Sequence, residues 1–181
     1  MLRGSEIAVG ACLLIDGRPR IAVEREAGAG AFRIRFRDLG TGSLAWRDFK
    51  ASERVEEAGI ELLDCEFQYS DDRSFVFASG AGLDLVEVPV AGQEDKAPFL
   101  KEGGTYAVVL WEGRPLDIRI PPKIVLAVVE FESYLRGDSL FSATKPARTE
   151  TGLVVRVPLD IERGERILVD TATRSFVERA P

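Results

Sequence analysis

The chain has 181 residues, 45% of them hydrophobic, and a formal net charge of −6 at pH 7. Its hydrophobic content excludes a disordered chain, and no apolar run approaches the roughly 18–20 residues of a membrane-spanning helix. It has no histidine, which removes the Ser–His and Cys–His pairs of nucleophilic enzymes and the commonest zinc ligand; metal or acid–base catalysis by carboxylates alone stays open. We therefore expect a globular, cytoplasmic protein that is not an enzyme and uses no cofactor or metal.

The negative charge is concentrated in the middle of the chain. Residues 1–62 carry ten Lys/Arg and ten Asp/Glu, residues 63–124 carry six against eleven, and residues 125–181 carry eight against nine. Because local patches rather than net charge decide contact with RNA, the charge excludes no RNA-binding function. Cys12 and Cys65 form no CxxC pair, and without a secretion signal we expect free core thiols rather than a disulfide.

The first third of the chain predicts strands joined by tight turns. Asp16-Gly17, a favoured two-residue turn, separates apolar runs and predicts a hairpin over residues 12–23. The small residues 27–31 suit a loop tip. In the following segment Phe32, Ile34 and Phe36 alternate with Arg33, Arg35 and Arg37, the period of two that is typical of a strand. A further strand is expected over residues 44–49.

The same rhythm continues to the end of the chain. Central strands are expected over residues 61–69, 74–78 and 83–88, and a hairpin over residues 106–120 turns at Glu112-Gly113. Residues 90–104 predict a helical turn at most, because Pro98 interrupts anything longer. The Ser70-Asp71-Asp72 segment predicts a turn. Residues 132–147 read as a loop between the strands of the last third, which are expected at 125–131, 153–157, 166–169 and 175–177.

This spacing favours an all-β chain of several small β-barrels over one continuous sandwich, which stays the alternative. Boundaries near residues 62 and 124 give three domains, 1–62, 63–124 and 125–181. Each is small for independent folding, so we expect close packing between neighbours.

One long motif is specific enough to indicate a family. Residues 145–164 (KPARTETGLVVRVPLDIERG) resemble the signature of bacterial elongation factor P. Further likeness lies in residues 37–42, 49–50, 110–115, 120–122, 137–139, 169–171 and 176–179. The resemblance implies a KOW-like, SH3-type first barrel followed by two OB-type barrels, in a row that forms an L. It also implies a monomeric factor that binds the 70S ribosome, P-site tRNA and ribosomal RNA, and that assists peptide-bond formation at proline-rich sequences.

The chain departs from the family at the hairpin tip. The family carries a modified lysine or arginine at the apex, whereas this chain has Gly28, Ala29 and Gly30, with no modifiable residue. The loop is also shorter than the family's, which reduces its reach by roughly 10 Å at about 3.3 Å per residue. We expect a divergent paralogue with an unmodified tip and weak or no rescue of polyproline synthesis.

Candidate RNA-binding residues come from the pattern and from the resemblance. The alternating arginines of residues 33–37, here called the arginine stripe, suit phosphate because a guanidinium can pair two oxygens. An exposed stripe is expected to be replaceable by serine at little cost in stability. The resemblance adds Phe176, which replaces the family's usual tyrosine, and others, so that the full set is Arg33, Arg35, Arg37, Gly137, Asp138, Ser139, Lys145, Phe176 and Arg179.

Two other function classes stay open. An RNA-binding or docking module with the elongation factor P fold that no longer relieves polyproline stalling is the main alternative. An enzyme has no catalytic constellation in its favour. The glycines of the tip resemble a phosphate-binding loop, but no Lys-Ser/Thr and no helix follows them.

Overall fold

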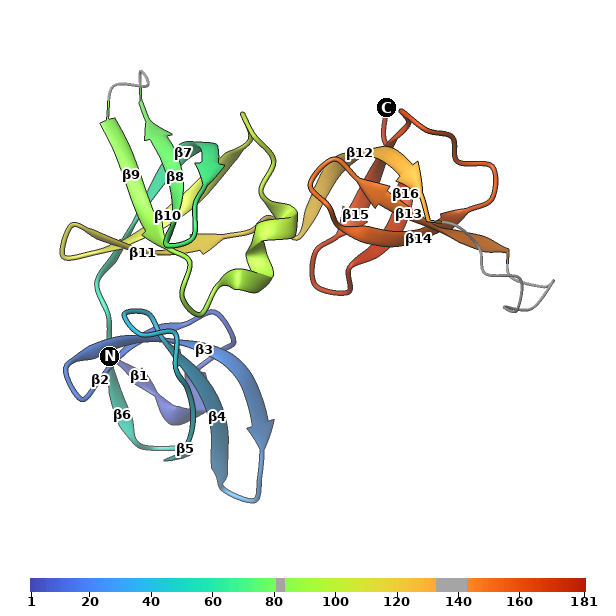
Figure 1. The fold of residues 1–181 in the computed structure, drawn as a ribbon. Coiled ribbons are helices and arrows are strands. Elements are labelled where there is room, and N and C mark those ends of the chain that lie inside the picture. The colour runs from blue at the N-terminus through green and yellow to red at the C-terminus, as the bar shows by residue number, and fades with distance from the viewer. Residues whose placement is uncertain (81–83, 133–142) are drawn as a thin grey trace. The chain divides into compact units, whose positions relative to one another are not determined.

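A computed structural model describes residues 1–80, 84–132 and 143–181. The described chain is nearly all β and forms three antiparallel sheets with a barrel-like form, as predicted (Figure 1). In the described residues the first sheet has the strand order β1-β6-β2-β3-β4-β5. Its elements are β1 (Leu2–Arg3), the 3₁₀ turn η1 (Gly4–Glu6), β2 (Cys12–Ile15), β3 (Arg18–Ala27), β4 (Ala31–Asp38), β5 (Leu44–Lys50) and β6 (Arg54–Glu57).

The second and third sheets each have five strands among the described residues, in the orders β11-β10-β7-β8-β9 and β14-β13-β12-β15-β16. The second contains β7 (Ile60–Ser70), β8 (Ser74–Ser79), β9 (Asp84–Pro89), β10 (Thr105–Trp111) and β11 (Arg114–Arg119), with the 3₁₀ helix η2 (Glu94–Phe99) between β9 and β10. The third contains β12 (Lys123–Phe131), β13 (Thr144–Thr149), β14 (Val154–Pro158), β15 (Arg166–Asp170) and β16 (Ser175–Arg179).

Two hairpin turns predicted from sequence are confirmed. Asp16 and Gly17 both have positive φ, 53° and 72°, and join β2 to β3. Glu112 and Gly113, at 50° and 75°, join β10 to β11 in the same way. Positive φ at both central residues matches the right-handed twist of the flanking strands.

The alternation of β4 places one row of its side chains in the core of the first barrel. Ile34 and Phe36 are completely or almost completely buried, together with Phe49 of β5 and Leu13 of β2. The Phe36 and Phe49 rings meet edge to face, with centroids 5.6 Å apart, an arrangement that adds to the area they bury. This core fixes which face of β4 is left for the arginines.

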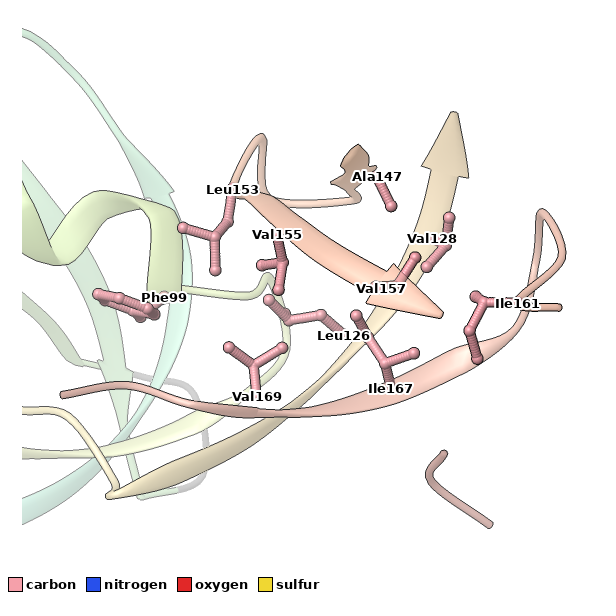
Figure 2. Packing of buried hydrophobic residues seen from close by; sticks show 10 residues of the cluster. All are labelled: Phe99, Leu126, Val128, Ala147, Leu153, Val155, Val157, Ile161, Ile167 and Val169. Atoms are coloured by element: carbon pink, nitrogen blue, oxygen red, sulfur yellow. The ribbon is translucent and has the colours of Figure 1, made fainter. Parts of the chain in front are cut away.

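The third barrel has a core of aliphatic side chains that converge from every strand of its sheet except β16 (Figure 2). Leu126 of β12, Val155 and Val157 of β14 and Ile167 of β15 are almost fully buried. Phe99, the last residue of η2, is buried in the same cluster. The packing of Cα atoms divides the chain accordingly into Met1–Glu94 with Ala107–Arg119, and Asp95–Tyr106 with Ile120–Pro181.

The sequence predicted a loop over residues 132–147, and this prediction is wrong at its end, because strand β13 begins at Thr144. Pro146 and its neighbours therefore pair with β14, opposite Arg156. A proline argues against a central strand because it lacks an N–H. Here β12 pairs with β13 only as far as Ala147, and beyond that point Glu132 donates its N–H to the Pro146 carbonyl at 3.2 Å, so at most one ladder bond is lost.

Other features agree with the sequence. Residues 94–99 form the short helical turn, with Pro98 inside it. Cys12 and Cys65 are free and buried, and burial raises the pKa of both thiols. Asp71 accepts the N–H groups of Arg73 and Ser74, which lowers the pKa of its carboxyl group.

No described helix is long and apolar enough to cross a membrane. The domain boundaries near residues 62 and 124 stay predictions.

Candidate nucleic-acid interface

The exposed part of the arginine stripe lies between acidic residues of the two neighbouring strands. Arg33 of β4 is paired in register with Glu26 of β3 and Asp48 of β5. Its Nε lies 3.9 Å from the Asp48 carboxylate. Arg35 is paired in register with Glu24, and its Nη1 lies 3.5 Å from that carboxylate. The two arginines are therefore largely neutralised on their own face, which weakens their attraction for phosphate.

Trp46 of β5 lies on the same face and was not singled out from sequence. It is the register partner of Arg35. The guanidinium carbons of Arg33 and Arg35 lie 5.1 and 6.0 Å from the Trp46 ring centroid. These are cation–π distances, so the indole holds the two guanidiniums close to the sheet. Its position two residues after Leu44, at the period of a strand, was the available signal.

Arg37, the third member of the arginine stripe, is not exposed, and its assignment to RNA contact is corrected. Its Nη2 lies 2.7 Å from Oδ2 of Asp117 in β11, and the side chains are 10% and 2% exposed. Oδ1 of Asp117 also accepts the backbone N–H of Ile118 at 2.8 Å. An arginine held in a buried ion pair is unavailable for phosphate, because withdrawing its charge from a buried carboxylate carries a large cost in free energy. Arg37 therefore stabilises the junction between β4 and β11.

The hairpin tip has no cationic side chain at its apex. Gly28, Ala29 and Gly30 are exposed, and Gly28 donates its N–H to the Ala31 carbonyl at 2.9 Å. Gly30 has a φ of 81°, which favours glycine. Lys50 of β5 is the register partner of Ala31, and Arg25, on the β3 arm of the hairpin, donates to the carbonyl of Ser5 at 3.0 Å and lies over the Phe32 ring. Its guanidinium is therefore held at the body of the barrel.

In the third barrel, the predicted residues that the structure describes all have partners within the protein. The Lys145 ammonium lies 3.8 Å from the Phe131 ring centroid. Phe176 packs partly against the core, which leaves less of its ring for stacking on a base. Arg179 lies 2.9 Å from Asp160 and 3.5 Å from Glu165, and the hydrogen bond to Asp160 raises its pKa. The predicted residues Gly137, Asp138 and Ser139 lie outside the described residues.

A second group of cations, which the sequence analysis missed, gathers where β1 meets β6. Arg3 and Arg54 face each other across these strands. Together with Ser5, Ala51 and Ser52 they line a hollow of about 430 Å³, here called the β1–β6 hollow. Its lining contains no acidic residue. Local sequence gives no signal for it, because its two arginines are far apart in the chain and become neighbours only through the pairing of β1 with β6. Within the described residues, no group of three His, Cys, Asp or Glu side chains could hold a metal ion.

Two family models match most of the chain. The model described as elongation factor P, C-terminal, matches residues 124–179, which contain the third sheet. The model described as elongation factor P (EF-P) OB domain matches residues 60–118, which contain most of the second.

Whole proteins match over nearly their full length. Elongation factor P of Treponema denticola is 41% identical over 184 residues, covering 99% of this chain and 98% of that protein. Elongation factor P of Dictyoglomus thermophilum is 32% identical over 185 residues, covering 99% and 100%. A solved structure described as eukaryotic translation initiation factor 5A from Methanococcus jannaschii aligns with a TM-score of 0.46 and 16% identity, over 66% of this chain and 90% of that one.

Proposed function

Because this chain belongs to the elongation factor P family of translation factors, we propose that it binds the 70S ribosome near the P and E sites. There it contacts P-site tRNA and ribosomal RNA, as a monomer, and assists peptide-bond formation at proline-rich sequences that stall. The observation that carries this proposal is the length of the match, since a relative at 41% identity covers 99% of this chain and is itself covered to 98%.

The hairpin tip decides how such assistance works. Residues 28–30 present backbone and one methyl group, and Arg25 is bonded to Ser5. The apex itself therefore carries no cation to approach the reacting end of the tRNA. The protein acts by holding the body of the tRNA, which limits losses of rate from a misoriented substrate. In this proposal the chain functions without a modified tip.

Ribosome binding is tested by co-sedimentation of the full chain with 70S particles that carry P-site tRNA, over a series of salt concentrations. We expect binding that weakens steeply with salt, because phosphate contacts release counterions. Binding that is absent at low salt, or that does not change with salt, would overturn the proposal.

A Pro-Pro-Pro reporter in cells without another elongation factor P tests the tip. We expect partial rescue above the empty-vector level and an intact mass equal to the sequence mass, apart from processing of Met1. The variant Ala29→Lys, which adds a cation at the apex, is compared with Ala29→Gln, which adds similar length without charge. Full rescue by the unchanged chain, or an added mass on residues 24–32, contradicts an unmodified tip.

The same experiments separate a second candidate function, an RNA-binding or docking module that no longer relieves polyproline stalling. The uncharged tip favours this alternative specifically. It predicts binding to ribosomes or RNA with reporter synthesis at the empty-vector level. Partial rescue excludes it.

A further inference from the structure

The β1–β6 hollow contains an electrostatic conflict that folding alone does not resolve. Arg3 and Arg54 are directly opposite each other in the antiparallel pair β1–β6. Both are exposed, and neither forms an ion pair with a carboxylate of the described residues. Like charges at directly opposite positions destabilise a pair of strands. An anion bound between the two guanidiniums would turn this repulsion into attraction.

The main chain beside these two arginines is held by backbone contacts. Gly4, next to Arg3, donates its N–H to the Glu53 carbonyl at 2.8 Å, and Ser5 donates to the Ala51 carbonyl at 3.3 Å. A Cβ at Gly4 would lie 2.2 Å from the Lys50 carbonyl oxygen, so η1 rests directly on the end of β5. Because η1 is attached to the β5–β6 turn at several points, the hollow is preorganised.

The groups that line the hollow are those that recognise phosphate. Two guanidiniums, from Arg3 and Arg54, are accompanied by the hydroxyl-bearing residues Ser5 and Ser52. Arginine pairs two phosphate oxygens at once, and a serine hydroxyl donates one further hydrogen bond. The volume of about 430 Å³ exceeds what one phosphate fills, which suits a phosphate that belongs to a larger chain.

The surroundings of the hollow also favour an anion. Arg25 donates to the Ser5 carbonyl at 3.0 Å, which brings a third cation to the rim. Two acidic residues are near, but both are occupied. Glu6 accepts the backbone N–H of Arg3 at 2.8 Å, and Glu53 lies 3.3 Å from Arg47. The charge of Glu53 is therefore partly compensated by a cation, whereas the backbone N–H stabilises the Glu6 carboxylate without changing its charge.

We propose that the β1–β6 hollow binds a phosphate group of an RNA backbone between Arg3 and Arg54. That the phosphate belongs to RNA rests on the function proposed above. That the hollow takes phosphate rests only on its own residues, so the two parts are tested separately.

The first experiment measures the melting temperature of the purified full chain in sodium phosphate and in sodium chloride of equal ionic strength. A ligand that binds only the folded state raises the melting temperature with its concentration. We expect phosphate to raise it for the unchanged chain and for the control Arg73→Gln/Arg163→Gln, which loses the same charge from exposed positions elsewhere. We expect a smaller rise in Arg3→Gln/Arg54→Gln, which keeps only the general stabilisation that phosphate gives folded proteins. An equal rise in that variant overturns the site.

The second experiment repeats the co-sedimentation with 70S particles. We expect Arg3→Gln/Arg54→Gln to bind more weakly at low salt and to lose about one from the slope of log K against log salt for each phosphate contact removed. The control variant should keep the affinity at low salt and the slope of the unchanged chain. If the variant binds ribosomes as the control does, the assignment to RNA is wrong even where free phosphate binds. If the unchanged chain fails to bind ribosomes but responds to phosphate, the proposed function fails and the phosphate site stands.

Discussion

Two regions of the first barrel carry exposed arginines, and their surroundings are opposite. In the arginine stripe, Arg33 and Arg35 lie beside Asp48 and Glu24 on adjacent strands. In the β1–β6 hollow, Arg3 and Arg54 face each other without a described carboxylate partner. The stripe is the more conspicuous pattern in the sequence, but the hollow is the more cationic site in the structure. Whether an arginine is available to phosphate depends on its neighbours across the sheet.

The arginine stripe is also divided within itself. Arg33 is exposed, whereas Arg37, four residues later on the same face, is buried against Asp117. The same side-chain type at the same period therefore has two functions, one at the surface and one in the interior. The expectation that all three arginines can be replaced at little cost in stability is consequently wrong for Arg37.

The largest expected effect is the loss of stability when Arg37, the buried member of the arginine stripe, is replaced. Arg37→Ser removes the guanidinium that pairs with the buried Asp117 carboxylate, so the free energy of unfolding should fall by about 3–5 kcal/mol. Arg33→Ser should change it by no more than about 0.5 kcal/mol. Denaturant titration followed by tryptophan fluorescence measures this, since Trp46 and Trp111 both report on the part of the chain that contains the ion pair. Equal midpoints for the two variants would refute a structural function for Arg37.

A methyl group at Gly4 should have the next largest effect, because it disturbs the frame of the hollow. The added Cβ meets the Lys50 carbonyl oxygen at 2.2 Å, and overpacking of this kind costs about 1–3 kcal/mol. Gly59→Ala is the matched control. No atom lies within 4 Å of a Cβ at Gly59, and its φ is not in the left-handed region, so the control should keep or slightly raise stability. A tolerated Gly4→Ala would contradict the rigid attachment of η1.

Removing one of the two facing arginines should raise stability. Arg54→Gln relieves the repulsion with Arg3 and should add about 0.2–1 kcal/mol at low salt. In about 1 M salt, where the Debye length falls to about 3 Å, the gain should disappear. Arg73→Gln, at an exposed turn, should stay within about 0.5 kcal/mol of the unchanged chain at both salt concentrations. A loss of stability in Arg54→Gln would mean that Arg54 has an attractive partner.

The smallest expected effect comes from removing the acidic residues beside the arginine stripe, which leaves its arginines without carboxylate neighbours, like those of the β1–β6 hollow. Glu24→Gln/Asp48→Asn removes the acids beside Arg33 and Arg35. Exposed ion pairs contribute at most about 1 kcal/mol, so stability should change little. Affinity for a short RNA duplex should rise, with a salt slope steeper by about one. The control Asp64→Asn/Asp72→Asn makes the same charge change on the second barrel. An equal gain in the control would assign the effect to net charge.

The sequence by itself determined the features that depend on near neighbours in the chain. Asp16-Gly17 and Glu112-Gly113 specify their turns, because a turn needs only the φ values of its two central residues. The alternation of Phe32, Ile34 and Phe36 specifies a strand with one core face, because the side-chain period of a strand is two. The long motif of residues 145–164 indicated the family, which the relatives confirm.

Tertiary structure decided which charges are free. Asp117 lies far along the chain from Arg37, and Arg54 comes to Arg3 only through the pairing of β6 with β1. Strand β13 was missed because Pro146 argues against a strand until its place at the end of the β12 pairing is known. No local pattern records such partners, because the register between distant strands is set by packing of the whole barrel. Of the candidate interface, the sequence therefore identified the arginines of β4 but neither their acidic neighbours nor the β1–β6 hollow.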